Sequence, residues 1–136
     1  MYYGRSVDNK LLIALSNLGS TQDAATELTK TDLSQLLDYL STYPDDGILY
    51  RSSAMILSDH SNAAYLNVSR AHSHTGAHIM LSNNTPVPSL NGPVLAIAQI
   101  IKNVMSSAVE AKLSGLFICA KAMIPLRNTL IEMGWH

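Results

Sequence analysis

ILYRSSAMILSDHSNAAY, at residues 48–65, contains short runs in which apolar and polar residues alternate. Alternation with a period of two is typical of a β-strand that buries one of its faces. We therefore predict a long first strand across these residues, in which a β-bulge is possible. The turn sequence PDDG, at residues 44–47, separates this strand from the segment before it.

Two shorter segments continue the strand pattern. GAHIMLS, at residues 76–82, predicts a returning strand after a polar turn at residues 67–75. VLAIAQII, at residues 94–101, is continuously apolar and predicts a third strand, although a buried helix fits the same run. Because consecutive strands usually pair with each other, we predict a three-stranded antiparallel sheet.

Two helices are predicted before the strands. Residues 7–18 carry apolar side chains at helical spacing after a possible cap at Asp8. The second helix begins at Thr31, with Thr31 or Asp32 as its cap, and ends before Pro44.

The C-terminal segment has the strongest helical pattern. Ser107 and Glu110 have the spacing of a capping box, and good helix formers follow as far as Met133. Pro125 is expected to kink this helix because proline removes an amide donor. The sequence thus predicts a mixed α/β (α+β) fold with two N-terminal helices, a three-stranded antiparallel sheet and a long kinked C-terminal helix.

Composition indicates a folded domain without strong affinity for nucleic acid. The 136 residues are 47% hydrophobic and 14% charged, with a formal net charge of −1. The single cysteine, Cys119, lies in an apolar run and is predicted to be a buried thiol. The N-terminus has no apolar signal core and no apolar run has membrane-spanning length, so we expect an intracellular protein of the cytoplasm or nucleus with no membrane contact.

Four stretches, in this order along the chain, resemble one protein family. Residues 2–8, YYGRSVD, and residues 36–45, LLDYLSTYPD, resemble the YYGRAVD and LLDYCATYPD elements of copia-type retrotransposon polyproteins. Residues 61–66, SNAAYL, and residues 101–108, IKNVMSSA, resemble SDASYL and LKNVMSSA in the same polyproteins. Together these stretches cover nearly the whole chain.

The resemblance implies the ribonuclease H region of such a polyprotein, degenerate and truncated at its C-terminus. Residues 1–47 would then be a helical connection segment, and residues 48–136 a truncated domain with a partial ribonuclease H-like fold. In that family the domain cleaves the RNA strand of RNA–DNA hybrids with two Mg²⁺ ions held by carboxylates. Such ions require several anionic oxygen ligands at one point.

By this resemblance, Asn62 stands at the position of the first catalytic carboxylate and Glu110 at that of the second. The amide of Asn62 is neutral and cannot supply the missing charge. Glu110 also fits a pure capping role in which it accepts from the Ser107 amide. Asp59 is an alternative metal ligand, but its odd offset from Asn62 predicts the opposite strand face unless a bulge intervenes. The other two family carboxylates lie beyond the long helix, where this chain has no residues.

Histidines in the second strand region allow a zinc alternative. His72, His74 and His78 would share one face of a regular strand, but their spacing matches no standard ligand template. We predict that they are structural.

We therefore expect a retroelement remnant that is catalytically inactive, binds RNA–DNA hybrid weakly or not at all, and holds no Mg²⁺. One alternative is an active nuclease that another chain completes. Another is an interaction or self-association module, because the first strand would have an open edge. That edge would take a second copy, giving a homo-oligomer, or a partner strand.

Overall fold

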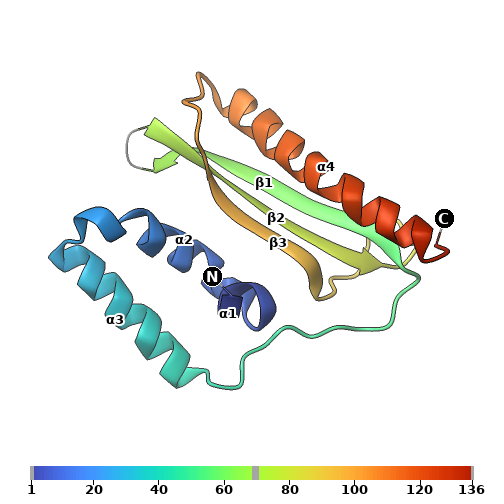
Figure 1. The fold of residues 1–136 in the computed structure, drawn as a ribbon, viewed down its shortest axis with the longest axis horizontal. Helices are drawn as coiled ribbons and strands as arrows, with labels where there is room; N and C mark the ends of the chain where they lie inside the picture. Colours follow the sequence, from blue (N-terminus) through green and yellow to red (C-terminus); the bar gives the residue numbers. More distant parts are fainter. Residues whose placement is uncertain (1, 69–70, 136) are drawn as a thin grey trace. The chain divides into compact units, whose positions relative to one another are not determined.

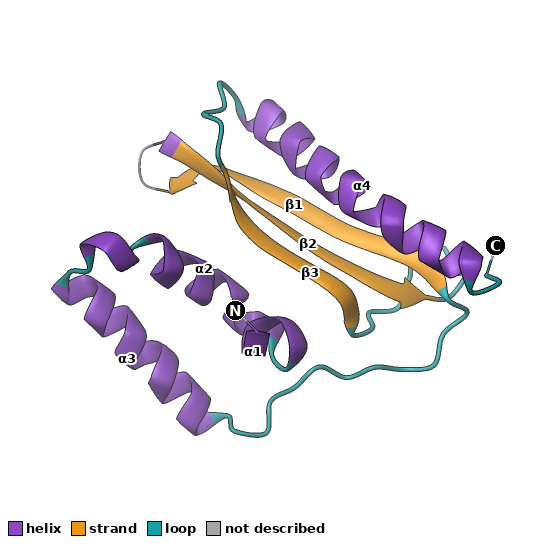
Figure 2. Cartoon of the chain, in the orientation of Figure 1, coloured by secondary structure: helices purple, strands orange, loops and turns teal. Residues whose placement is uncertain are grey.

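The computed structural model describes residues 2–68 and 71–135. The chain divides into two compact units, Met1–Ile48 and Leu49–His136, so that the division falls one residue beyond the expected end of the connection segment. Figures 1 and 2 show helices in the first unit and a sheet with one long helix in the second. None of the helices in the described ranges combines the length and apolar character needed to cross a membrane.

The first unit consists of short helices followed by one longer helix. In chain order these are α1 (Tyr2–Ser6), a 3₁₀ turn (Asn9–Leu11), α2 (Leu12–Ser20), a second 3₁₀ turn (Gln22–Ala24) and α3 (Glu27–Thr42). The sequence pattern missed α1. The Asp8 side chain accepts a hydrogen bond from Lys10 N at 3.0 Å, so Asp8 caps the first 3₁₀ turn rather than α2.

The start of α3 corrects a sequence prediction. Thr26 Oγ1 accepts from Thr29 N at 3.3 Å, and Thr29 Oγ1 accepts from Thr26 N at 3.2 Å, which forms a reciprocal cap. Thr31 lies inside the helix, where its hydroxyl donates to Glu27 O at 3.1 Å. The predicted cap at Thr31 or Asp32 is wrong because the first turn of α3 is exposed and has no apolar periodicity to reveal it.

A polar cluster joins the two ends of the first unit. Asp46 Oδ2 accepts from Lys10 Nζ at 2.6 Å and from Tyr39 OH at 3.0 Å. The Tyr39 hydroxyl also lies 3.5 Å from Oδ2 of the buried Asp8. These hydrogen bonds, that of Lys10 first, lower the pKa of Asp46. The turn after α3 is therefore held to the segment that precedes α2.

The second unit contains a three-stranded antiparallel sheet with the order β1-β2-β3. Its strands are β1 (Ile56–Val68), β2 (His72–Ser82) and β3 (Pro93–Ile101). The three predicted strands and their antiparallel pairing are confirmed. Because β1 and β3 are the outer strands, each has one edge without a paired strand among the described residues.

The first strand starts later than its sequence pattern indicates. β1 begins at Ile56, so the predicted strand from Ile48 is wrong for its first part. Met55, immediately before β1, has a φ of 61°, a left-handed conformation that interrupts regular pairing. The segment before Met55 is instead held by hydrogen bonds to side chains: Arg51 N donates to Asn91 Oδ1 at 2.7 Å, and Asn91 Nδ2 donates to the Arg51 carbonyl at 2.9 Å.

The second strand starts earlier than predicted. β2 begins at His72, so the predicted turn at residues 67–75 is partly strand, and residues 69 and 70 of that turn lie outside the described residues. Pairing with β1 is regular from Ile56 to Ala64, and the register shifts only between Ala64 and Val68. No bulge therefore lies between Asp59 and Asn62, and the irregularity of β1 falls at its far end.

The long helix α4 (Ala108–Glu132) covers one face of the sheet and packs mainly on β1 (Figure 1). Ser107 Oγ accepts from Glu110 N at 3.1 Å, which confirms the predicted cap. The helix continues through Pro125 as far as Glu132.

Small residues form the buried side of α4. Ala111, Gly115 and Cys119 recur at intervals of one helical turn and are buried against the sheet. Ala111 joins a core cluster with Ala63, Ile101 and Met105, a residue of the loop between β3 and α4. Cys119 is 1% exposed, so the prediction of a buried thiol is confirmed.

Candidate functional site

The register of β1 assigns its residues to two faces of the sheet. Ala63 is buried beneath α4, where a Cβ atom on Gly115 would lie 3.1 Å from the Ala63 Cβ atom. Asp59 lies on the same face as Ala63 because the pairing between them is regular and their offset is even. His60 and Asn62 lie on the opposite face, which points away from α4.

Asn62 is exposed, and its side chain contacts the backbone of the next residue. Asn62 Oδ1 accepts a hydrogen bond from Ala63 N at 2.9 Å. Thr75 Oγ1, from β2, donates to the Asn62 carbonyl at 3.3 Å. The position that resembles the first catalytic carboxylate therefore presents a neutral amide whose oxygen already accepts a hydrogen bond.

Asp59 lies under α4, beside Cys119. Burial and then the Asp59 carboxylate raise the pKa of the Cys119 thiol to about 12. Asp59 Oδ1 is itself buried and has no hydrogen-bond partner among the described residues. Because no bulge lies between Asp59 and Asn62, the Asp59 carboxylate points to the other side of the sheet from the Asn62 side chain.

Glu110 lies in the exposed first turn of α4. Its Oε2 atom accepts from Ser106 Oγ at 2.6 Å and from Ser106 N at 2.7 Å. These two hydrogen bonds lower the pKa of the Glu110 carboxyl. The predicted acceptance from the Ser107 amide is wrong, because the carboxylate reaches the amide one residue earlier.

The three positions do not fit a site for two magnesium ions. Mg²⁺ needs near-octahedral oxygen ligands, and two ions need several anionic ones at one point. The Asn62 side chain has no charge, and the Asp59 carboxylate lies on the opposite face of the sheet from it. The Glu110 carboxylate already accepts hydrogen bonds from Ser106. Within residues 2–68 and 71–135, no group of three or more His, Cys, Asp and Glu side chains is arranged to hold a metal ion.

The histidines lie on the sheet face opposite α4. His72, His74 and His78 occupy alternate positions of β2, and His78 is directly opposite His60 of β1. His78 Nε2 lies 2.8 Å from the Asn91 carbonyl oxygen, to which it donates. Burial lowers the pKa of His74. Since the described histidines belong to no metal-binding group, the zinc alternative gains no support.

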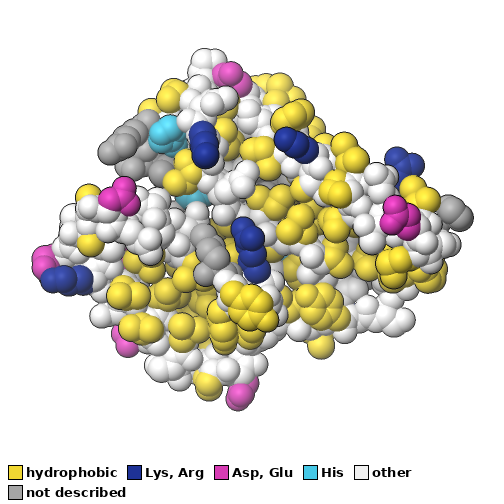
Figure 3. Space-filling model, viewed as in Figure 1, with side chains coloured by type: hydrophobic (Ala, Val, Ile, Leu, Met, Phe, Trp, Pro, Cys, Tyr) yellow, Lys and Arg dark blue, Asp and Glu magenta, His cyan; other side chains and the backbone are white. Residues whose placement is uncertain are grey.

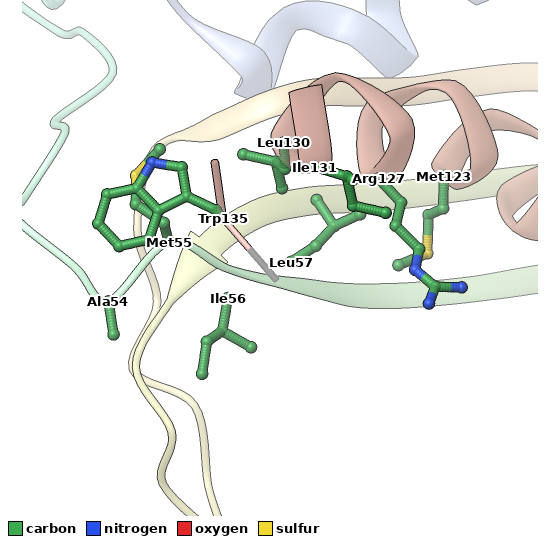
Figure 4. Close-up of a pocket in the computed structure, with 9 residues that line it drawn as sticks. All are labelled: Ala54, Met55, Ile56, Leu57, Met123, Arg127, Leu130, Ile131 and Trp135. Atoms are coloured by element: carbon green, nitrogen blue, oxygen red, sulfur yellow. The ribbon is translucent and has the colours of Figure 1, made fainter. Parts of the chain in front are cut away.

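A groove that the sequence did not reveal lies where β1 begins and α4 ends. It has a volume of about 490 Å³, and Arg127 is the charged residue among otherwise apolar lining residues. Figure 4 shows residues of both segments around it, among them Met55, Leu57, Met123, Leu130 and Trp135. These residues are remote in sequence, so no local pattern relates them.

The outer surface of α4 is also apolar. Figure 3 shows hydrophobic side chains over this helix, with Lys and Arg side chains between them. The exposed apolar residues of the helix are Val109, Leu113, Leu116, Phe117, Ile124 and Ile131. The sequence could have revealed this surface, because apolar residues occur around the whole helix and not only on the side that packs on the sheet.

Searches against protein-family models, curated proteins and solved structures found no match to this chain.

Proposed function

We propose that the Leu49–His136 unit is a degenerate ribonuclease H-like domain, derived from a copia-type retrotransposon polyprotein, that does not cleave RNA. The four family-like stretches support this origin, as does the order of three antiparallel strands followed by a long helix. The observation that carries the proposal of inactivity is the neutral side chain of Asn62 at the position of the family's first carboxylate.

The physical reason is charge. Hydrolysis with two magnesium ions needs several anionic oxygens at one point, because each ion brings two positive charges. Asn62 supplies none, and the nearest carboxylate along the strand, Asp59, faces α4. Of the three candidate positions, Glu110 is then the one that offers a carboxylate to such a site, and a single anion is too few for two magnesium ions.

Cleavage of a labelled RNA–DNA hybrid by the purified protein in Mg²⁺ tests this proposal. We expect no more product with the wild-type chain than with Glu110→Gln. Glu132→Gln is the matched control, because Glu132 is an exposed carboxylate at the other end of the same helix. Cleavage that survives in Glu132→Gln and disappears in Glu110→Gln would refute inactivity.

A variant that adds a negative charge at position 62 tests, through metal-ion binding, whether the missing charge prevents Mg²⁺ from binding. Asn62→Asp restores an anionic oxygen on the open face of β1, so we expect a higher affinity for Mg²⁺ or Mn²⁺ than in the wild type. Isothermal titration calorimetry measures this directly. An increase that Ser58→Asp reproduces would show only a general effect of charge, since Ser58 lies on the same face of β1.

The open edge of β1 favours a second candidate function, that of an interaction module. An edge strand exposes unpaired backbone groups, and a large exposed apolar surface commonly marks a contact with another protein. Both features occur together here, on β1 and α4. Light scattering that shows only monomers, combined with failure to bind any extended peptide, would refute this candidate.

A further inference from the structure

We infer that the groove between α2 and α3, in the first unit, binds a cationic amphipathic helix of another protein. The inference rests on the shape of this α2–α3 groove, on the small core of the unit and on its negative charge. It does not depend on the ribonuclease H-like origin proposed for the second unit, nor on the surfaces of β1 and α4.

The α2–α3 groove has the shape of a site for a third helix. Its volume is about 550 Å³, within the range of protein sites that bind ligands. Each wall is one face of a helical segment, because the lining residues recur at intervals of three and four. They include Leu11, Ala14 and Leu18 on one wall and Asp32, Gln35, Leu36 and Tyr39 on the other. A helix laid along both walls would contact all of these positions.

The first unit buries little apolar surface of its own. Among its large apolar residues in the described range, the buried ones are Leu11, Leu12 and Leu36. Ile13, which lines the groove, is 63% exposed. Helices as short as α2 owe most of their stability to packing against other elements. A third helix in the groove would bury Ile13 and add packing that two helices alone do not provide.

Charge decides which kind of helix the groove accepts. The first unit carries three basic and seven acidic residues, a formal net charge of −4. In the groove, Lys10 is already paired with Asp46 at 2.6 Å, whereas Asp32 forms no ion pair among the described residues. Complementary charge speeds association and selects between partners. The helix that fits therefore carries Lys or Arg beside its apolar face.

The dimensions and the charge together limit the occupant. α2 has nine residues, so at about 1.5 Å per residue its wall is about 13–14 Å long. A helix of about three turns spans this length, with apolar anchors at positions i, i+3, i+4 and i+7. The first unit of a second copy is disfavoured, because two units of charge −4 repel each other.

Two synthetic peptides test the inference on the full chain. The probe is fluorescein-Ala-Leu-Lys-Gln-Leu-Leu-Gln-Lys-Leu-Ala-Lys-Leu-Gln-amide, whose leucines share one helical face, and the second peptide has Glu in place of each Lys. Fluorescence anisotropy measures both affinities. We expect the Lys peptide to bind at least about tenfold more tightly, because the Glu peptide opposes like charges. Nuclear magnetic resonance should show changes at backbone amides within residues 10–18 and 32–39.

Two aspartates of α3 separate a contact in the groove from the general charge of the unit. Asp32→Asn and Asp38→Asn remove the same charge from exposed positions, but Asp32 lines the groove and Asp38 does not. We expect Asp32→Asn to weaken binding of the Lys peptide at least about threefold more than Asp38→Asn does. Equal effects of the two variants would contradict a contact with Asp32.

A second pair of variants tests the apolar contact. Ile13→Ser should weaken both peptides at least about fivefold, because it removes apolar area that the helix would cover. Leu28→Ser is the control, since Leu28 is a 69% exposed residue of α3 that does not line the groove. Circular dichroism verifies that the variants fold. If one does not, the amides that change in the wild-type chain decide the location of the site.

Equal affinity for the Lys and Glu peptides would overturn the inference, as would absence of binding at millimolar concentration or amide changes confined to the second unit. Changes at the groove amides that depend on protein concentration without peptide would overturn it in favour of a second copy. None of these outcomes bears on RNA cleavage, so this test and that of the proposed function fail separately.

Discussion

Gly115 of α4 lies so close to Thr75 of β2 that a Cβ atom on Gly115 would stand 2.7 Å from Thr75 Oγ1. Thr75 is 3% exposed, and its hydroxyl donates to the Asn62 carbonyl at 3.3 Å, so it has little freedom to move away. The missing side chain at Gly115 is what allows α4 to approach the sheet at this point.

Gly115→Ala should therefore destabilise the second unit, although alanine is the better helix former. We expect a loss of about 1–3 kcal/mol in the free energy of unfolding, typical of overpacking in a close-packed core. Urea unfolding followed by Trp135 fluorescence measures it. Gly76→Ala is the control, because its nearest neighbour would be the Ile97 carbonyl oxygen at an ordinary 3.6 Å. A similar loss in both variants would contradict the close contact.

The buried thiol of Cys119 should make the second unit less stable in alkali. Its pKa is raised from 9.0 to about 12 in the folded chain, so the contribution to stability is complete below pH 9 and declines as the pH rises toward 12. The cause is burial first and Asp59 second. Urea unfolding at several pH values should show a shallower alkaline decline in Cys119→Ala than in the wild type. Parallel declines would be inconsistent with a shifted thiol.

The Cys119 thiol should also resist alkylation in the native chain. Iodoacetamide reacts with the thiolate, which both the raised pKa and the burial of Cys119 disfavour. We expect slow labelling at pH 8 and rapid labelling in urea, measured by mass spectrometry. Rapid native labelling would mean that α4 opens readily from the sheet.

Ser107→Ala should weaken the start of α4 by about 0.5–2 kcal/mol, because the hydroxyl caps the Glu110 amide at 3.1 Å. Thermal unfolding of the second unit gives the measurement. Thr129→Ala serves as the control, since the Thr129 hydroxyl bonds only to the Pro125 carbonyl of the same helix, at 3.0 Å. An effect no larger than that of the control would argue against capping.

The carboxylate of Glu110 adds a pH dependence of the opposite sign. Its hydrogen bonds from Ser106 lower its pKa below the ordinary 4.5, so its contribution is present above pH 4.5 and is lost as the pH falls through the lowered value. The stability difference between the wild type and Glu110→Gln should therefore shrink in acid. A difference that stays constant down to pH 2 would exclude this contribution.

Several features could be read directly from neighbouring residues. The later part of β2, the short apolar run of β3 and the cap at Ser107 depend on residues close in sequence. The buried state of Cys119 follows from the apolar run around it. In contrast, α1 and the start of α3 carry few buried side chains, so no apolar pattern revealed them.

For the candidate site, the sequence determined which residue types were present. The neutral Asn62 and the capping position of Glu110 were evident from the chain alone, and so was the odd offset of Asp59 from Asn62. Only tertiary structure could decide whether a bulge reverses that offset, because a bulge depends on how β1 pairs with β2. The register places the irregularity after Ala64, which leaves Asp59 on the face beneath α4.

The groove beside β1 was likewise decided by tertiary structure alone. Leu57 and Trp135 are far apart in sequence and meet only because α4 packs antiparallel to β1 (Figure 4). Residue order specifies local conformation through steric preference and hydrogen bonding between near neighbours. A surface built by two distant segments depends on how they pack, and that is a property of the folded chain.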